Sequence, residues 1–447
     1  MSQYYGNQTS DLSASMTSSS IASDVQETSS LVPMPLTRTV SLSGSTNKLE
    51  PDDIGQVFGN ILVTLFNNGN YEAVLELADE LLQQHPKSIF LNNIIAEVNA
   101  IADKAHAAIH HYKMVINEDP KLPNAHNNIA VAYKNIGYFE QAEDHLKTAL
   151  HLKPDFAQAY NNYGNLASDQ ADMAAAQKHF LKSIDLDPSK ANAYWNLHST
   201  ATDLDTAKAI VEQCLEKDAK YEPAIYTLAA INAYKGDRQF FDWLMTTELA
   251  SDSVLRSVEW ILSLPKLPEL HFNRWSVFDA AIAMSDIKRP FYEFGVWMGE
   301  SFKYLNKAYK KGYGFDTFTG LPEDWHTVPQ GTYSSYGNIP KIKGGEFIVG
   351  EFSETLPKFF AKKRPMASLI NLDADLYSST LCALNHSLPI IDAKTVLVFD
   401  ELIVNHQWEN DEYKALVEFC TNHKFDFEVH MVSLFTKQVV VTLKAGS

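Results

Sequence analysis

The sequence is poor in cysteine and contains no long apolar run. Its 447 residues include only three cysteines, Cys214, Cys382 and Cys420, and none of them form a CxxC spacing. This odd number excludes a disulfide framework and a thiolate zinc site, and it favours a reducing compartment. No apolar run approaches the roughly 20 residues of a membrane span, and residues 1–12 lack the features of a signal peptide. We therefore expect a cytoplasmic protein without a membrane span.

Basic residues are also scarce. The chain has 37 Lys and Arg against 55 Asp and Glu, which gives a formal net charge of -18. An acidic excess of this size repels a phosphate backbone, and no Lys/Arg stripe offsets it, so nucleic acid is excluded as an expected partner. The remaining composition, 45% apolar and 21% charged residues, is that of a globular chain. Its length favours two or three domains.

Residues 1–47 are mainly Ser, Thr, Gln and other small polar types, without a sustained apolar period. This composition predicts a disordered tail. A solvated leader and a docking segment are both compatible with it.

A repeat follows the tail. Prolines recur every 34 residues, which is the tetratricopeptide period, at Pro86, Pro120, Pro154 and Pro188. Three further sets share the period: Ala125, Ala159 and Ala193; Asn128, Asn162 and Asn196; Ala108, Ala142 and Ala176. The unit 124–154 closely resembles a tetratricopeptide repeat. About five such helical hairpins, over residues 52–222, must stack into a solenoid to bury their apolar faces.

The solenoid should present a concave binding surface. Asn93, Asn127 and Asn161 recur every 34 residues and could bond the backbone of an extended peptide. Two alternatives stay open. These amides can instead pair with neighbouring helices, and the solenoid can act as a spacer or dimer contact. Residues 223–273 are expected to form a helical connector that packs onto the end of the solenoid.

The period changes after residue 273. Five short apolar runs alternate with helical stretches, which predicts a parallel α/β sheet: residues 291–297, 313–318, 346–350, 367–372 and 396–399. Two further runs, 427–432 and 439–443, are joined by so few residues that they must pair antiparallel. The predicted fold is therefore multidomain, an α-solenoid followed by a Rossmann-like α/β domain over residues 274–447. The terminal reversed hairpin matches class I methyltransferases better than dehydrogenases.

Acidic residues follow two of the predicted strands. Asp373 and Asp375 come after one apolar run, and Asp400 and Glu401 come after the next. Carboxyl ends of neighbouring parallel strands border the ligand crevice, and converging carboxylates there suggest a divalent cation. Two alternatives are that the acids cap the following helices and that Asp375 has a structural role.

The first strand of the predicted sheet leads into a glycine turn. Gly295 permits a tight turn, Gly299 admits a ligand close to the backbone, and Asp316 follows Gly295 by 21 residues. An acid at that position can accept hydrogen bonds from both ribose hydroxyls. The GxGxxG pattern of pyrophosphate cofactors is absent, so S-adenosylmethionine fits better than a nicotinamide dinucleotide.

Together these segments resemble the macrocin O-methyltransferase (TylF-type) family over residues 274–443. The matching stretches are 293–296, 314–325, 355–357, 372–380 and 399–401. The resemblance implies methyl transfer from S-adenosylmethionine to a sugar or other hydroxyl with the aid of Mg²⁺. It also assigns roles: cofactor contacts at Glu293, Gly295, Gly299 and Ser301, the ribose ligand at Asp316, and metal ligands at Asp373, Asp400 and Glu401. The family often has Gly at the position of Ala374, and Asp at that of Glu401.

Oxygen-bound Mg²⁺ would stabilise an alkoxide and hold it in line with the sulfonium methyl. Asp373 is also the candidate general base. The long irregular stretch 320–345 suggests a lid over the acceptor. Candidate acceptor contacts are Trp325 and His326 in that stretch, and His406 and Trp408 after the second acidic pair; a packed surface loop is the alternative.

The sequence thus favours a Mg²⁺-dependent O-methyltransferase whose acceptor is a sugar or glycan hydroxyl and whose solenoid docks a protein. One alternative is a non-enzymatic tetratricopeptide scaffold with an inactive methyltransferase-like domain. A nicotinamide-linked oxidoreductase is a third and less favoured reading. A homo-oligomer is compatible with all three, because solenoids and such sheets both tend to self-associate.

Overall fold

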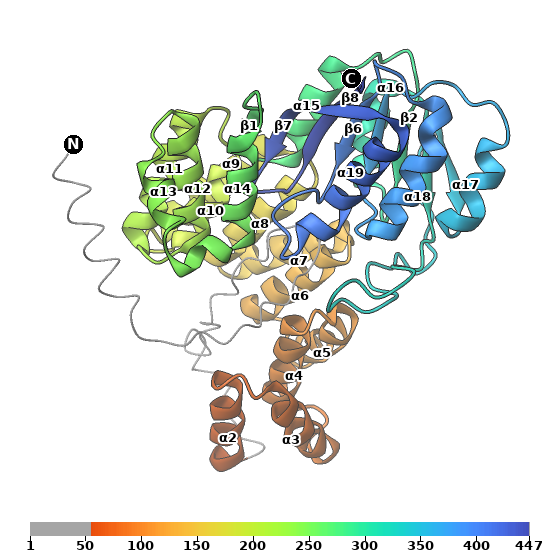
Figure 1. The fold of residues 1–447 in the computed structure, drawn as a ribbon. Helices are drawn as coiled ribbons and strands as arrows, with labels where there is room; N and C mark the ends of the chain where they lie inside the picture. The colour runs from red at the N-terminus through yellow and green to blue at the C-terminus, as the bar shows by residue number, and fades with distance from the viewer. Residues whose placement is uncertain (1–54, 447) are drawn as a thin grey trace.

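The computed structural model describes residues 55–446, so the predicted tail over residues 1–47 lies outside the described residues. A helical solenoid comes first and an α/β sheet second (Figure 1). No helix among residues 55–446 is long and apolar enough to cross a membrane.

The solenoid consists of successive antiparallel helix pairs. They are α2 (Gln56–Asn67) with α3 (Tyr71–Gln84), α4 (Ile89–Ile101) with α5 (Ala105–Glu118), α6 (Pro123–Asn135) with α7 (Phe139–Leu152), α8 (Ala157–Asp169) with α9 (Met173–Leu186), and α10 (Ala191–His198) with α11 (Leu204–Lys217). The repeated alanines Ala108, Ala142 and Ala176 are fully buried where paired helices approach. The predicted repeat register is confirmed.

The recurring asparagines have a structural role. Asn162 Nδ2 donates to Asn127 Oδ1 at 2.8 Å, and Asn196 Nδ2 donates to Asn161 Oδ1 at 3.0 Å. Asn127 and Asn161 are only 1% and 3% exposed. Each amide therefore joins one repeat to the next, and the predicted peptide-binding ladder is wrong for these two positions. The partners are side chains of the second asparagine set rather than the helix backbone that the alternative named.

Removing one of these amides should destabilise the solenoid. We expect Asn127→Leu to lower the free energy of unfolding by about 1–3 kcal/mol, because the buried amide of Asn162 loses its acceptor. The control is Asn117→Leu, a change at an exposed position of α5, which should have little effect. Urea unfolding followed by circular dichroism measures the difference. Equal losses in the two variants would contradict an inter-repeat role for Asn127.

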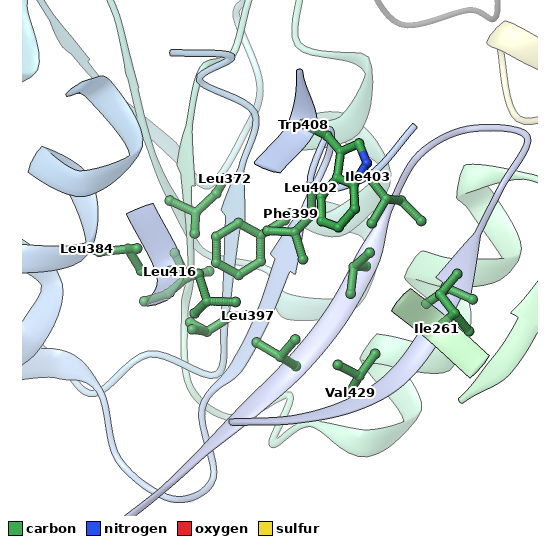
Figure 2. Close-up of a cluster of buried hydrophobic side chains, with 14 of the residues drawn as sticks. Ile261, Leu372, Leu384, Leu397, Phe399, Leu402, Ile403, Trp408, Leu416 and Val429 are labelled. Carbon is green, nitrogen blue, oxygen red and sulfur yellow. The ribbon is translucent and has the colours of Figure 1, made fainter. Parts of the chain in front are cut away.

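The connector is part of the sheet core. Its elements are α12 (Glu222–Tyr234), α13 (Gln239–Leu244), η2 (Glu248–Ser251), α14 (Ser253–Ser263) and β1 (Glu269–His271). Ile225 and Ile261 are buried in the same cluster as Leu397 and Val429 of the sheet, and Figure 2 shows Ile261 facing Val429. The prediction of a wholly helical connector missed β1, because a strand of three residues has no measurable period.

The sheet has eight strands in the order β1-β7-β8-β6-β5-β2-β3-β4. The remaining strands are β2 (Phe291–Phe294), β3 (Gly312–Asp316), β4 (Gly345–Val349), β5 (Leu369–Leu372), β6 (Val396–Phe399), β7 (Phe425–Ser433) and β8 (Val439–Ala445). Strands β4, β3, β2, β5 and β6 pair in parallel, and β8 runs antiparallel to β6 and β7. The predicted α/β sheet with a reversed terminal hairpin is present.

Helices cover both faces of this sheet, so the central strands are buried on both sides. One face packs on α15 (Arg274–Met284) and α16 (Glu300–Tyr309). The other packs on α17 (Phe352–Phe360), α18 (Tyr377–Ser387) and α19 (Glu412–His423), with short turns η3 (Leu388–Ile390) and η4 (Trp408–Asn410). Strand β2 ends at Phe294, before the predicted residue 297, because Gly295 turns the chain with φ 87°.

The solenoid contacts the loops that follow the parallel strands. Trp275 Nε1 donates to the Ser168 carbonyl at 2.6 Å, and the Tyr336 ring packs edge-on against His106 with centroids 4.5 Å apart. Gly137, between α6 and α7, lies directly against Met298 in the turn after β2. The far end of the solenoid, with α2 and α3, projects away from the sheet (Figure 1). The carboxyl edge of the sheet therefore faces the repeats.

Candidate functional site

The predicted acidic residues converge at the carboxyl edge of the sheet. Asp373 N donates to the Phe294 carbonyl and Asp400 N donates to the Leu372 carbonyl, both at 2.8 Å. These bonds continue the ladders between β2, β5 and β6 past the ends of the strands. Asp373 and Asp400 are therefore neighbours, as the sequence predicted.

Asp400 is held by donors from two other elements. Arg274 Nη2, at the start of α15, lies 3.1 and 2.8 Å from the two carboxylate oxygens of Asp400. Gln438 Nε2 donates to Oδ1 at 2.6 Å. Asp400 is 2% exposed, so this ion pair is shielded from solvent. Both oxygens of the carboxylate already have partners within the chain.

Glu401 is held in the same way by a second cation. Lys437 Nζ lies 3.4 Å from Glu401 Oε1, and Asn405 Nδ2 donates to Oε2 at 2.6 Å. Glu412 Oε2 accepts the Glu401 amide at 3.1 Å. Glu401, Lys437, Asn405 and Glu412 are all buried. This half of the cluster is a closed network of hydrogen bonds.

Burial raises the pKa of Asp373 well above its usual range, the charge of Asp400 raises it further, and Arg274 opposes the rise. Burial also raises the pKa of Asp375, with Glu401 as the next contribution and Lys437 opposing it. The two residues therefore share one electrostatic environment with Asp400. Asp375 belongs to the cluster and lies in the turn between β5 and α18 with φ 58°.

The cluster does not have the arrangement expected of a magnesium site. No group of three or more His, Cys, Asp or Glu side chains in residues 55–446 is placed to hold a metal ion. Mg²⁺ prefers six oxygen ligands in near-octahedral geometry. The oxygens of Asp400 and Glu401 instead face Arg274 and Lys437. The residues present therefore do not fit the Mg²⁺ ion that was expected at Asp373, Asp400 and Glu401.

The glycine turn after β2 is tightly packed. A Cβ added to Gly295, which has φ 87°, would lie 1.6 Å from the Asp373 carbonyl oxygen. A Cβ on Gly299, at φ 83°, would lie 2.8 Å from Pro340 Cγ. Ser301 is buried in the first turn of α16. The position expected to admit a cofactor beside Gly299 is thus covered by Pro340 in this arrangement.

Asp316, at the end of β3, fixes the same turn. Its Oδ2 accepts the amides of Val296 and Trp297 at 2.7 and 2.8 Å, and its Oδ1 accepts the amide of Phe318 at 2.6 Å. A carboxylate offers about four acceptor positions. Backbone amides fill three of these acceptor positions, so one position remains for a ribose hydroxyl. The sequence had suggested that Asp316 accepts hydrogen bonds from both ribose hydroxyls.

Glu293 lies inside β2 and is 0% exposed. Its Oε1 accepts Asn371 Nδ2 at 2.8 Å, and its Oε2 has no hydrogen-bond partner among the described residues. Burial raises the pKa of Glu293 to about 8, while hydrogen bonds from Ser301 and Asn371 oppose the rise. At neutral pH the protonated form of Glu293 therefore predominates, and its predicted cofactor contact stays a prediction.

This raised pKa predicts a pH dependence of stability. The pKa of Glu293 is about 8 in the folded chain and about 4.3 in an unfolded one. Between these values the folded state keeps a proton that the unfolded chain has lost, so the free energy of unfolding falls as pH rises. The slope from this group approaches about 1.4 kcal/mol per pH unit.

The variant Glu293→Gln cannot ionise, so its stability should fall less steeply between about pH 5 and pH 8. Thermal unfolding of both proteins across this range measures the difference. Parallel pH profiles would contradict the assignment of a neutral Glu293.

The stretch after β3 forms a packed cover. Trp325 is 3% exposed and lies in a small apolar cluster with Leu321, Val328 and Leu376. Its ring faces are not available to a sugar, so the acceptor contact predicted for Trp325 is not present in this arrangement. His326 Nε2 lies 3.0 Å from a carboxylate oxygen of Asp411, which ties the cover to the loop after β6.

The two other candidates for acceptor contact, Trp408 and His406, differ in exposure. Trp408 is 3% exposed and packs against Trp260 and Tyr413, and Figure 2 places it in the apolar cluster beside Ile403. Its predicted acceptor contact is therefore wrong for this arrangement. His406 is exposed, and its carbonyl accepts Arg256 Nη2 at 2.7 Å.

Sequence reasoning missed Arg274, Lys437 and Gln438. The last two precede β8, which lies beside β6 with Val439 paired to Phe399. An antiparallel strand begins where its neighbour ends, so the residues before Val439 meet the acids after Phe399. The reversed terminal hairpin was predicted from the sequence. The position of β8 between β6 and β7 was not predicted, and without it the residues before β8 could not be placed beside the acids after β6.

Comparisons with known proteins bear on the helical part. Residues 123–156 and 157–190 match the tetratricopeptide repeat family. These segments are tetratricopeptide repeats. The units lie in the region of the 34-residue period, and they correspond to α6–α7 and α8–α9. No curated protein matches the chain.

Solved structures resemble the solenoid only distantly. A thermophilic tetratricopeptide protein of Thermus thermophilus has 20% identity and a TM-score of 0.36, and the match covers 40% of this chain and 98% of that one. Pseudomonas aeruginosa pilF has 16% identity and a TM-score of 0.38, covering 42% and 90%. YrrB, described as having an unusual peptide-binding site, has 15% identity and a TM-score of 0.30, covering 40% and 94%.

Proposed function

We propose that the α/β domain is an O-methyltransferase that uses S-adenosylmethionine and that the repeat solenoid docks a protein partner. The observation that carries this proposal is the meeting of Gly295, Asp316 and Asp373 after β2, β3 and β5. Strand β2 lies between β3 and β5, so the direction of the strand order reverses there. In open α/β sheets, ligands bind at such a switch point, outside the carboxyl ends of the strands.

The residue types at this turn are those that an S-adenosylmethionine site needs. Asp316 retains an acceptor position for a ribose hydroxyl, and Gly295 gives the close turn of backbone that such a site needs. Pro340 must move away from Gly299 for the cofactor to enter. S-adenosylmethionine, when bound, supplies an electrophilic methyl group on a sulfonium sulfur. The remaining chemistry belongs to the side chains at the edge of the sheet.

Asp373 is the proposed general base. The Asp373 carboxylate would take the proton of the acceptor hydroxyl while the bound S-adenosylmethionine would supply the methyl group that this oxygen receives. A sugar or glycan hydroxyl is the proposed acceptor, because of the resemblance to the macrocin O-methyltransferase family, with His326 and His406 as its neighbours.

The proposed location is the cytoplasm. Cys214, Cys382 and Cys420 are free thiols, which suits a reducing compartment.

The second candidate is a tetratricopeptide scaffold with an inactive sheet domain. The closed carboxyl edge favours it: Pro340 covers Gly299, Asp316 holds backbone amides, and Trp325 is buried. Tetratricopeptide repeats suggest protein docking under either candidate.

Methyl transfer from labelled S-adenosylmethionine to fractionated cell extract separates the two candidates. The methyltransferase proposal expects a labelled product with the wild-type protein and at least a hundredfold less with Asp373→Asn, because loss of a general base typically costs 10²–10⁴-fold in rate. The control is Asp279→Asn, on the outer side of α15, which should retain the activity. No label above that of heat-treated protein would favour the scaffold.

A further inference from the structure

The acidic cluster contains its own cations. Arg274 comes from the first turn of α15 and Lys437 from the turn before β8. They lie 2.8 Å from Asp400 Oδ2 and 3.4 Å from Glu401 Oε1. Each thus neutralises one of the two adjacent acids that follow β6. A divalent ion bound by this pair would have to displace both of them.

Arg274 is fixed by its neighbours on the solenoid. Asn273, which caps α15, donates from Nδ2 to the Ser199 carbonyl at 2.8 Å. Trp275 Nε1 donates to the Ser168 carbonyl at 2.6 Å. The residues on both sides of Arg274 are therefore bonded to repeat backbone. The solenoid sets the position of the guanidinium at the acidic cluster.

Lys437 is enclosed by the cluster. It is buried together with Glu401 and Asn405, and the ammonium also donates to Asn405 Oδ1. Gln438, the next residue, donates to Asp400. A buried ion pair is strongly destabilised when one partner is withdrawn, because the remaining charge stays without compensation. A metal that took the two acids would leave the charges of Arg274 and Lys437 without their partners, so displacing these cations is unfavourable.

We propose that Arg274 and Lys437 are the resident counter-cations of this site and that they take the place of a divalent metal. Arg274 is in addition a positioning residue through which the docked solenoid holds Asp400 beside Asp373. This inference deepens the proposed methyltransferase and, for the catalytic step, rests on it. The acceptor proton then passes to Asp373 without a metal-bound oxygen.

Binding of Mn²⁺ by the full chain tests the inference without relying on activity. The electron paramagnetic resonance signal of free Mn²⁺ is followed as wild-type protein and Asp400→Asn are titrated. The expected result is the same weak, unsaturated binding in both, from surface acids alone. Saturable binding of one Mn²⁺ per chain that is lost in Asp400→Asn would overturn the proposal.

A gain of binding gives the converse test. The double variant Arg274→Met, Lys437→Met exposes the oxygens of Asp400 and Glu401, so it should gain one saturable Mn²⁺ and a higher melting temperature on adding the ion. Lys437→Met alone, which keeps Arg274, should gain a weaker site if the double variant does not fold. Folded variants that bind no more Mn²⁺ than wild type would contradict the claim that these cations occupy the metal position.

The cofactor arm separates this inference from the proposed function. Binding of S-adenosylhomocysteine to the wild type is measured by calorimetry with EDTA and with Mg²⁺, and equal affinities are expected. Affinity that falls at least tenfold in EDTA overturns metal independence but upholds the methyltransferase. Absence of binding in both buffers would contradict the proposed function. The Mn²⁺ titration would still decide whether Arg274 and Lys437 occupy the metal position.

Discussion

Gly295→Ala should destabilise the protein by about 3 kcal/mol or more, since a left-handed backbone costs an L-residue roughly 1–2 kcal/mol and a backbone clash adds to this. Gly295 has φ 87°, and a Cβ there would lie 1.6 Å from the Asp373 carbonyl oxygen. The two backbones are joined beside this contact by the hydrogen bond from Asp373 N to the Phe294 carbonyl, which opposes their separation. The site and the sheet would therefore be distorted together.

Gly331→Ala is the matched control. Gly331 has φ 85°, but nothing lies within 4 Å of a Cβ at this position. It should therefore show only the backbone cost, about 1–2 kcal/mol. Denaturant unfolding of both variants separates the two contributions. Equal losses would contradict the close approach of the turn to Asp373.

Arg274→Ala should lower the free energy of unfolding by about 3–5 kcal/mol, the cost typical of withdrawing one partner from a buried ion pair. The side chains of Arg274 and Asp400 are 19% and 3% exposed. The control is Arg238→Ala, which removes an ion pair with Asp242 on the solvent-exposed side of α13. Exposed pairs contribute about 0–1 kcal/mol, so that loss should be small.

A second substitution distinguishes lost charge pairing from lost packing. In the Arg274→Ala background, Asp400→Asn removes the uncompensated charge and should recover part of the stability. The unfolding midpoints of the two single variants and the double variant complete the cycle. Additive losses would contradict a direct coupling between Arg274 and Asp400.

The repeats were predictable because their constraint is periodic. Four residue sets at one spacing specify which residues face the neighbouring repeat, and burial of Ala108, Ala142 and Ala176 follows directly. Helix α10 has only 8 residues, so the fifth repeat departs from the regular pattern of the others. The parallel direction of the five central strands was likewise predictable from alternating apolar runs.

The partners of the acids were less accessible to sequence reasoning. Which cation reaches Asp400 depends on where α15 is docked, and that docking depends on bonds from Asn273 and Trp275 to the solenoid. No local pattern encodes such contacts. The same limit explains Trp408: an aromatic next to a predicted site looks like a ligand contact until the fold places it in the core.

Asparagine recurrence shows a related ambiguity. Periodic polar residues on a solenoid can serve a ligand or the next repeat, and their spacing is identical in both cases. The 2.8 Å bond between Asn162 and Asn127 decides between them here. The paired amides of Asn127 and Asn161 are therefore not available to a partner, whereas α2 and α3 project away from the sheet (Figure 1).

The most direct test of a cofactor site at the glycine turn is calorimetry of S-adenosylhomocysteine with the full-length protein and with Asp316→Ala. Circular dichroism should first establish that the variant is folded, because Asp316 also holds the amides of Val296 and Trp297. We predict one saturable site in the wild type, with at least tenfold weaker binding in the variant. Absence of binding to the wild type, or equal binding by a folded variant, would contradict a cofactor site at this turn.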